Sequence, residues 1–186
     1  MTLVDLVVTV HSALARASLG HAFGGALALA YIADPRGTVD VDVNVFLPVE
    51  AIQSVLDSLA PLGLRAERPP GEWVPISGVR LRRAPDGYPV DVFPSLDERY
   101  AVIEERCVMR PFGPEGELLP FLSAEDLALF KLSFGRDKDW VDLRSIAVAE
   151  PDLDVDYIER QLVGLRGPAM YPRIARLRRL VREPAG

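Results

Sequence analysis

Two aspartates separated by one residue are the strongest candidates for chemistry in this chain. Asp40 and Asp42 lie in a segment, 38–47, in which every second residue from Val39 to Val45 is valine. This period of two is typical of a strand, with the valines on one face and the aspartates on the other. Carboxylates at i and i+2 of a strand lie only about 7 Å apart. Because two like charges so close together disfavour ionisation unless a cation lies between them, the pair is a candidate metal site.

A pair of glycines, Gly24 and Gly25, precedes a run rich in Ala and Leu that predicts a helix to about Ile32. Paired glycines at the start of a helix allow backbone N–H groups to approach a phosphate, and the helix N-terminus favours the negative charge. The sequence therefore predicts a phosphate-binding turn followed by a carboxylate pair.

A third aspartate, Asp91, alternates with Val90 and Val92 in the second half of a predicted hairpin. The two strands of that hairpin are expected at 78–83 and 88–93, around the turn 84–87. If the second strand lies beside the first carboxylate strand, Asp91 completes a cluster of three. Oxygen ligands on rigid strands suit Mg²⁺ or Mn²⁺ rather than zinc. Taken alone, Asp91 is better explained as an exposed strand residue at a hairpin; its metal role depends on the glycine pair and the aspartate pair beside it.

The elements that must position these residues predict an α+β fold, with a small mixed β-sheet flanked by helices and a helical C-terminal part. We expect the α/β core over residues 1–122 and the helical part over 123–186, packed on the core and not necessarily an independent domain. In the core, helices are expected at 3–14, 48–60 and 97–106, a short strand at 64–67, a loop at 69–71 and a second hairpin at 107–112 and 117–119. In the C-terminal part, helices are expected to begin at Ser123 and to span 137–148, 154–165 and 171–181.

The composition is that of one packed domain, or one domain with a helical extension. The chain has 186 residues, 49% of them hydrophobic and 26% charged. The single cysteine, Cys107, excludes an internal disulfide and suits a reducing compartment. The apolar N-terminal segment lacks the basic start of a signal peptide and has helical periodicity, and no run is long enough to cross a bilayer. We therefore expect a cytoplasmic protein.

The net charge of −6 is unevenly distributed, since residues 166–186 contain six arginines and one acidic residue. An acidic body with a basic tail can still contact a phosphate backbone through the tail. Equally, these arginines can be the solvated face of a last helix.

Together, the motifs Gly24-Gly25, Asp40-x-Asp42 and the later Asp91 resemble the nucleotidyltransferase family of the DNA polymerase β superfamily, in a minimal form. The segments 123–131 and 136–142 are similar to the matching part of AbiEii and MenT-type toxins. The resemblance covers residues from about 20 to 150. Many members have Gly-Ser in place of Gly24-Gly25, so this chain offers no hydroxyl there and only its backbone amides face the phosphate.

This resemblance implies transfer of a nucleoside monophosphate from a nucleoside triphosphate (NTP), with release of pyrophosphate. Asp40, Asp42 and Asp91 would hold Mg²⁺ or Mn²⁺, and Asp91 would also help to deprotonate the acceptor hydroxyl. Lys131 would pair with the triphosphate, unless its stem merely covers apolar surface. Further nucleotide-binding candidates are Gly24, Gly25, Arg36, Thr38, Arg136 and Asp142. Asp139 and Asp142 share one helix face and would orient Lys131 or the sugar, unless they are solvated charges.

In the toxins that the chain resembles, the acceptor is RNA, notably the tRNA 3′ end, and the partner is a cognate antitoxin. The C-terminal arginines would then bind the RNA. A second possibility is a small-molecule nucleotidyltransferase of the aminoglycoside-modifying kind, whose cationic acceptor suits an acidic chain. A third is a catalytically silent binding module, against which three carboxylates on strands argue, because burying them without a metal is costly.

Overall fold

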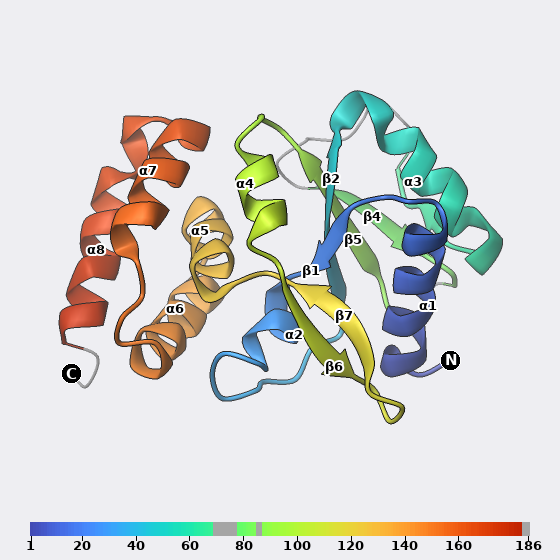
Figure 1. Ribbon diagram of the computed structural model, residues 1–186, viewed down its shortest axis with the longest axis horizontal. Coiled ribbons are helices and arrows are strands. Elements are labelled where there is room, and N and C mark those ends of the chain that lie inside the picture. The colour runs from blue at the N-terminus through green and yellow to red at the C-terminus, as the bar shows by residue number, and fades with distance from the viewer. Residues whose placement is uncertain (69–77, 85–86, 184–186) are drawn as a thin grey trace. The chain divides into compact units, whose positions relative to one another are not determined.

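A computed structural model describes residues 1–68, 78–84 and 87–183. The loop expected at 69–71 and the hairpin tip at 85–86 lie outside these ranges. The chain forms two compact units, whose elements are labelled in Figure 1. The sheet unit contains Met1–Leu27 and Gly37–Phe121, and the helical unit contains Ala28–Arg36 and Leu122–Gly186.

The sheet unit is built on seven strands in the order β3-β4-β5-β2-β1-β7-β6. β2 and β5 are parallel, as are β1 and β7, and the other neighbours are antiparallel. The mixed sheet and both predicted hairpins are thereby confirmed. The strands are β1 (His21–Phe23), β2 (Val41–Pro48), β3 (Arg65–Ala66), β4 (Val79–Arg82), β5 (Val90–Ser95), β6 (Val108–Phe112) and β7 (Glu117–Phe121).

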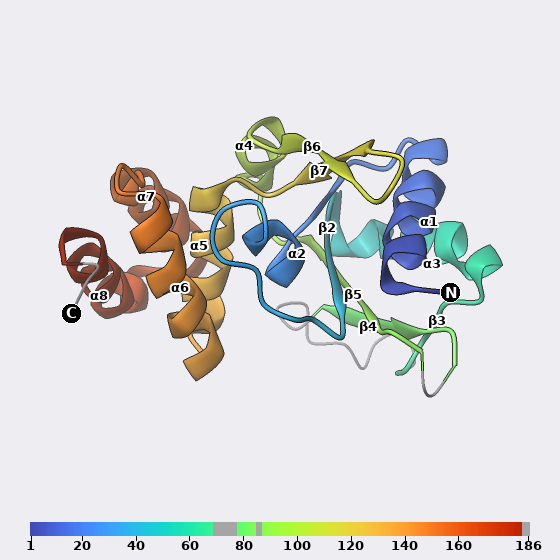
Figure 2. The same ribbon diagram turned by 90° about the horizontal axis from the view of Figure 1, so that it is seen from below.

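Among the residues that the structure describes, four helices and two short 3-10 turns belong wholly or partly to this unit. They are α1 (Leu3–Arg16), α2 (Gly25–Leu29), η1 (Val49–Ala51), α3 (Ile52–Leu59), η2 (Ala60–Leu62) and α4 (Tyr100–Glu105). α1 begins at a capping box between Thr2 and Asp5. It packs beside α3, as Figure 2 shows, while α4 contacts β2.

The predicted strand around the aspartate pair is confirmed from Val41 onward and is wrong before it. Val41, Val43 and Val45 are fully buried, whereas Val39 is 72% exposed and precedes the strand. Asp40 also precedes β2. The hydroxyl of Thr38 accepts a hydrogen bond from the Asp40 N–H at 3.4 Å, and such local bonds compete with strand pairing.

Helix boundaries also differ from the prediction, and α4 begins at Tyr100 rather than at residue 97. α2 ends at Leu29 rather than near Ile32, and the chain continues in turns in which the N–H groups of Ile32 and Ala33 both donate to the Leu29 carbonyl oxygen. Pro48 does not open a helix; it is the last residue of β2, and the helical region begins after it with η1.

The helical unit contains four main helices. They are α5 (Ala124–Phe134), α6 (Asp137–Ala149), α7 (Val155–Arg166) and α8 (Tyr171–Arg182), with a 3-10 turn, η4 (Pro168–Met170), before the last. α5 packs against α6 and α7, and α8 packs against the same two helices. Ser123 caps α5, as predicted, and Gly135 ends the helix with φ 67°. Within the described residues, no helix is long and apolar enough to cross a membrane.

Candidate active site

Asp42 and Asp91 lie directly opposite each other on the neighbouring parallel strands β2 and β5. The condition on which Asp91 was expected to join the aspartate pair, that its strand lies beside that of Asp42, is therefore met. Residues paired in this way have Cα atoms about 4.8 Å apart and present their side chains on the same face of the sheet. Two carboxylates are therefore brought together from segments almost fifty residues apart in the sequence.

The glycine pair packs against the first of these carboxylates. The N–H of Gly24 donates to the Asp42 carbonyl oxygen at 2.9 Å. Gly25 begins α2 with φ 54°, and a Cβ atom there would overlap the carboxylate of Asp42. Only glycine fits this position, because both the conformation and the space exclude a side chain.

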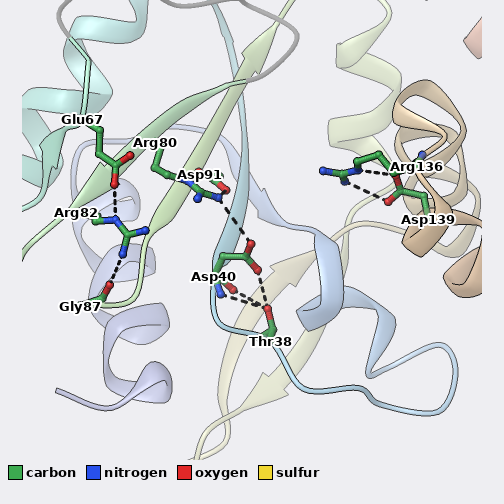
Figure 3. Close-up of polar contacts among 9 residues, drawn as sticks. All are labelled: Thr38, Asp40, Glu67, Arg80, Arg82, Gly87, Asp91, Arg136 and Asp139. Atoms are coloured by element: carbon green, nitrogen blue, oxygen red, sulfur yellow. Dashed lines mark hydrogen bonds and ion pairs between the residues drawn. The ribbon is translucent and has the colours of Figure 1, made fainter. Parts of the chain in front are cut away.

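Asp40 is held at the entry to β2 by its neighbour Thr38. The Thr38 hydroxyl oxygen lies 2.8 Å from Oδ1 of Asp40 and 3.0 Å from its carbonyl oxygen. Figure 3 shows this loop beside the strands that carry Arg80 and Asp91. The structure thus gathers Thr38, Asp40, Asp42 and Asp91 in the sheet unit.

Arg80 on β4 is a member of this cluster that the sequence reasoning missed. It lies opposite Asp91, with Nε 2.7 Å from Oδ1 and Nη2 2.5 Å from Oδ2. The same Nη2 lies 3.9 Å from Oδ2 of Asp40 (Figure 3). The hydrogen bonds to Asp91 raise the pKa of the guanidinium above its ordinary value. A signal existed, because Arg80 alternates with Val79 and Leu81 and so shares a face with Asp91 across the hairpin.

The three carboxylates fit a divalent metal by donor type, since oxygen is the ligand that Mg²⁺ and Mn²⁺ prefer. The arrangement of the three carboxylates fits a metal ion less well than their donor type does. Among the described residues, no group of three or more His, Cys, Asp or Glu side chains is close enough to hold a metal ion. Both oxygens of Asp91 bind Arg80 instead. The metal-holding role of Asp40, Asp42 and Asp91 stays a prediction.

A second polar cluster lies within the helical unit and centres on Asp142. Lys131 Nζ lies 2.5 Å from Oδ2 of Asp142, while Arg36 binds both carboxylate oxygens at 2.8 and 2.9 Å. The Lys131 and Asp142 side chains are only 6% and 2% exposed. Burial raises the pKa of Asp142, but the hydrogen bonds from Arg36 and Lys131 outweigh it and leave the pKa below its ordinary value. Lys131 is thus no surface-covering lysine, and Asp142 is no solvated charge.

Arg136 and Asp139 form a separate pair at the start of α6 (Figure 3). Oδ2 of Asp139 accepts from the backbone N–H of Arg136 at 3.0 Å and from its Nε at 2.8 Å. Asp139 is buried and completes a capping box. It therefore caps this helix, and in the contacts described it binds Arg136 rather than Lys131.

Most of the C-terminal arginines are bound within the helical unit. Arg166 donates to Ser133, Arg173 to the carbonyl oxygens of residues 132 and 133, and Arg178 to Asp156 and Glu159. Arg176 stacks over Trp140 at 3.8 Å. Four of the six arginines expected to bind RNA therefore hold helices together.

A cavity of about 470 Å³ lies at the opposite ends of β2 and β5 from Asp42 and Asp91. Its acidic lining residues are Glu50, Asp97, Glu98 and Glu104. The cavity is thus a different place from the carboxylate cluster.

Comparison with known proteins identifies the fold. No family model matches the chain, and no curated protein sequence matches it significantly. Solved structures do. A crystal structure of ANT(2″)-Ia in complex with adenylyl-2″-tobramycin is 17% identical, with a TM-score of 0.62 over 91% of this chain and 99% of that one.

Two further structures share the architecture. A nucleotidyltransferase-like protein from Paracoccidioides brasiliensis is 18% identical, with a TM-score of 0.54 over 92% of each chain. The lincosamide antibiotic adenylyltransferase LnuA, bound to lincomycin, is 16% identical, with a TM-score of 0.50 over 78% of this chain and 96% of that one. The chain therefore has the fold of these nucleotidyltransferases.

Proposed function

We propose that this protein is a metal-dependent nucleotidyltransferase that moves a nucleoside monophosphate from an NTP to a small-molecule hydroxyl and releases pyrophosphate. The observation that carries the proposal is the in-register pair Asp42 and Asp91, with Gly25 packed on Asp42. The pair occurs on a fold shared with ANT(2″)-Ia and LnuA.

In this proposal Asp40, Asp42 and Asp91 hold Mg²⁺ or Mn²⁺, which when bound would neutralise charge on the triphosphate and lower the pKa of the acceptor hydroxyl. Asp91 accepts the proton of that hydroxyl as it attacks the α-phosphate. The backbone N–H of Gly25, at the start of α2, binds a phosphate oxygen, while Gly24 fixes the turn because its N–H donates to the Asp42 carbonyl oxygen. Thr38 positions Asp40 through its hydrogen bond.

The cations of the helical unit are proposed to bind nucleotide phosphates. Arg36 is better suited than Lys131, because its side chain is 40% exposed whereas the ammonium of Lys131 is buried on Asp142. Asp142 then acts as a positioning residue that fixes the fork of Arg36 and holds Lys131. Arg136, whose side chain is 54% exposed, is a further phosphate-binding candidate.

A small-molecule acceptor has more support than RNA. ANT(2″)-Ia was solved with an adenylylated aminoglycoside and LnuA with lincomycin. A net charge of −6 favours a cationic acceptor over a polyanion. The C-terminal arginines offer little to RNA, since most are engaged within their own unit. The tRNA 3′ end, as the acceptor of a toxin with a cognate antitoxin, therefore has less support than a small molecule.

The test is a transfer assay with Mg²⁺ and each labelled NTP in turn. Acceptors are an aminoglycoside panel, a lincosamide and total tRNA. We expect label in a small molecule, lost in Asp42→Asn and kept in Asp57→Asn, a matched change on the exposed side of α3, where Asp57 binds Gln53. Label in tRNA would replace the proposed acceptor, and no transfer to any acceptor would contradict the activity.

A further inference from the structure

We infer that Arg80 is a built-in competitor of the metal ion at Asp91, so that a divalent cation gains this carboxylate only when the guanidinium leaves it. The inference rests on the proposed function for the metal, but its evidence is the set of contacts around Arg80. It assigns a role to a residue outside the predicted site.

Three charged residues form a row across three neighbouring strands. Asp42 on β2 pairs in register with Asp91 on β5, which pairs in register with Arg80 on β4. All three side chains therefore project from the same face of the sheet. Asp40 approaches the same guanidinium from the loop before β2. Arg80 thus neutralises carboxylates that would otherwise repel one another.

The contact with Asp91 is of the strong, bidentate kind. Two N–H groups of Arg80 meet the two oxygens of Asp91 at 2.7 and 2.5 Å, a fork that matches carboxylate geometry. A divalent ion at these oxygens would lie within a few ångströms of the guanidinium charge. Because like charges at that distance repel, the two cations cannot both be held well.

Arg80 is able to leave without unpacking the sheet. Its side chain is 42% exposed, whereas that of Asp91 is 12% exposed. The carboxylate is fixed by its strand, and the guanidinium lies on a long flexible stem at the surface. Exchange of one cation for the other therefore needs only a side-chain rotation.

Arg82 supplies a matched control on the same strand. It lies two residues further along β4 and shares the face of Arg80, but it binds Glu67 and the carbonyl oxygen of Gly87 (Figure 3). Replacing Arg82 removes the same charge from the same face and leaves the contact with Asp91 intact.

The test measures Mn²⁺ binding by electron paramagnetic resonance, with the full chain and without nucleotide or acceptor. We expect Arg80→Gln to bind Mn²⁺ roughly five- to tenfold more tightly than the wild type, since a partly exposed but bidentate pair is lost. Arg82→Gln should change the affinity less than about twofold, as a more distant charge does at physiological salt. Adding Asp91→Asn to Arg80→Gln should cancel the gain.

Thermal unfolding gives a second readout. Without metal, Arg80→Gln should melt below the wild type because Asp91 loses its partner, and saturating Mn²⁺ should raise its melting temperature more than that of the wild type. Equal Mn²⁺ affinities, an equal gain in both arginine variants, or no binding in any variant would overturn the inference. Transfer activity together with equal Mn²⁺ affinities would support the proposed function and overturn this inference. Tighter Mn²⁺ binding by Arg80→Gln without any transfer activity would support this inference and contradict the proposed function.

Discussion

The backbone of Gly25 lies directly against the carboxylate of Asp42, with no space for a side chain between them. The contact joins the start of α2 to the second residue of β2. Since the N–H of Gly24 also donates to the Asp42 carbonyl oxygen, the glycine turn and the aspartate form one rigid structure. The position of the glycine turn, which we propose binds phosphate, and that of the carboxylate are therefore fixed together.

Gly25→Ala should accordingly abolish most of the proposed transfer activity. The new Cβ must displace Asp42 and adopt a positive φ, and displacements of about 1 Å in an active site cost on the order of a hundredfold in rate. Steady-state kinetics would measure this. Gly37→Ala is the control, because a Cβ there meets no atom within 4 Å. Comparable rates in the two variants would contradict the role of the contact.

Removing Asp142 should destabilise the protein more than removing Lys131. Asp142→Asn leaves the ammonium of Lys131 buried without its carboxylate, and breaking a buried pair in this way costs about 3–5 kcal/mol. Lys131→Met leaves Asp142 with both hydrogen bonds from Arg36, so the loss should be smaller. Urea unfolding followed by circular dichroism would compare the two. A larger loss in Lys131→Met would show that Arg36 does not compensate.

The alternation of valine and aspartate was sufficient to predict both β2 and the face that carries Asp42, because burial of the valines dictates which side chains turn outward. The same alternation predicted that Asp91 lies on the opposite face of its strand from Val90 and Val92. It failed at Val39 and Asp40, where the local hydrogen bonds of Thr38 replace strand pairing. A period of two cannot reveal where a strand begins.

Partners that lie far apart in the sequence were beyond prediction. Lys131 and Arg36 meet at Asp142 only because the helical unit includes the segment 28–36. The residue types also did not indicate whether the C-terminal arginine side chains were available to bind RNA. In the structure, Arg173 binds backbone carbonyls and Arg176 stacks on Trp140. These contacts depend on helix packing, which is not local information.

Tyr157→Phe should lower stability without affecting the sheet unit. The Tyr157 hydroxyl donates to Oδ1 of Asp126 at 2.7 Å, joining α7 to a fully buried carboxylate of α5. Leaving a buried acceptor without its hydrogen bond costs about 1–3 kcal/mol. Thermal and urea unfolding would measure the loss. Tyr171→Phe, at an exposed tyrosine of the same unit, should change stability by less than about 0.5 kcal/mol. Equal effects would contradict the buried bond.

The pair His11 and His21 should make the sheet unit sensitive to mild acid. Nδ1 of His21 donates to the Leu19 carbonyl oxygen at 2.8 Å, so its Nε2 accepts from Nδ1 of His11 at 2.9 Å. Protonation of His21 makes its Nε2 a donor, so the bond survives only if His11 moves its own proton from Nδ1 to Nε2. Burial lowers the pKa of both rings, and Glu117 only partly offsets this at His11.

Because the folded pKa values lie below the ordinary 6.5, the unfolded chain takes up protons first as the pH falls. The stability contribution is therefore complete above 6.5 and is lost below it, by at most about 1.4 kcal/mol per pH unit for each proton. Urea unfolding between about pH 5 and pH 8 would measure this slope. His21→Gln should flatten it, whereas the conservative change of exposed Glu183→Gln should leave it unchanged. An unfolding free energy that is constant across this range in the wild type would exclude the histidine pair as an acid-sensitive contact.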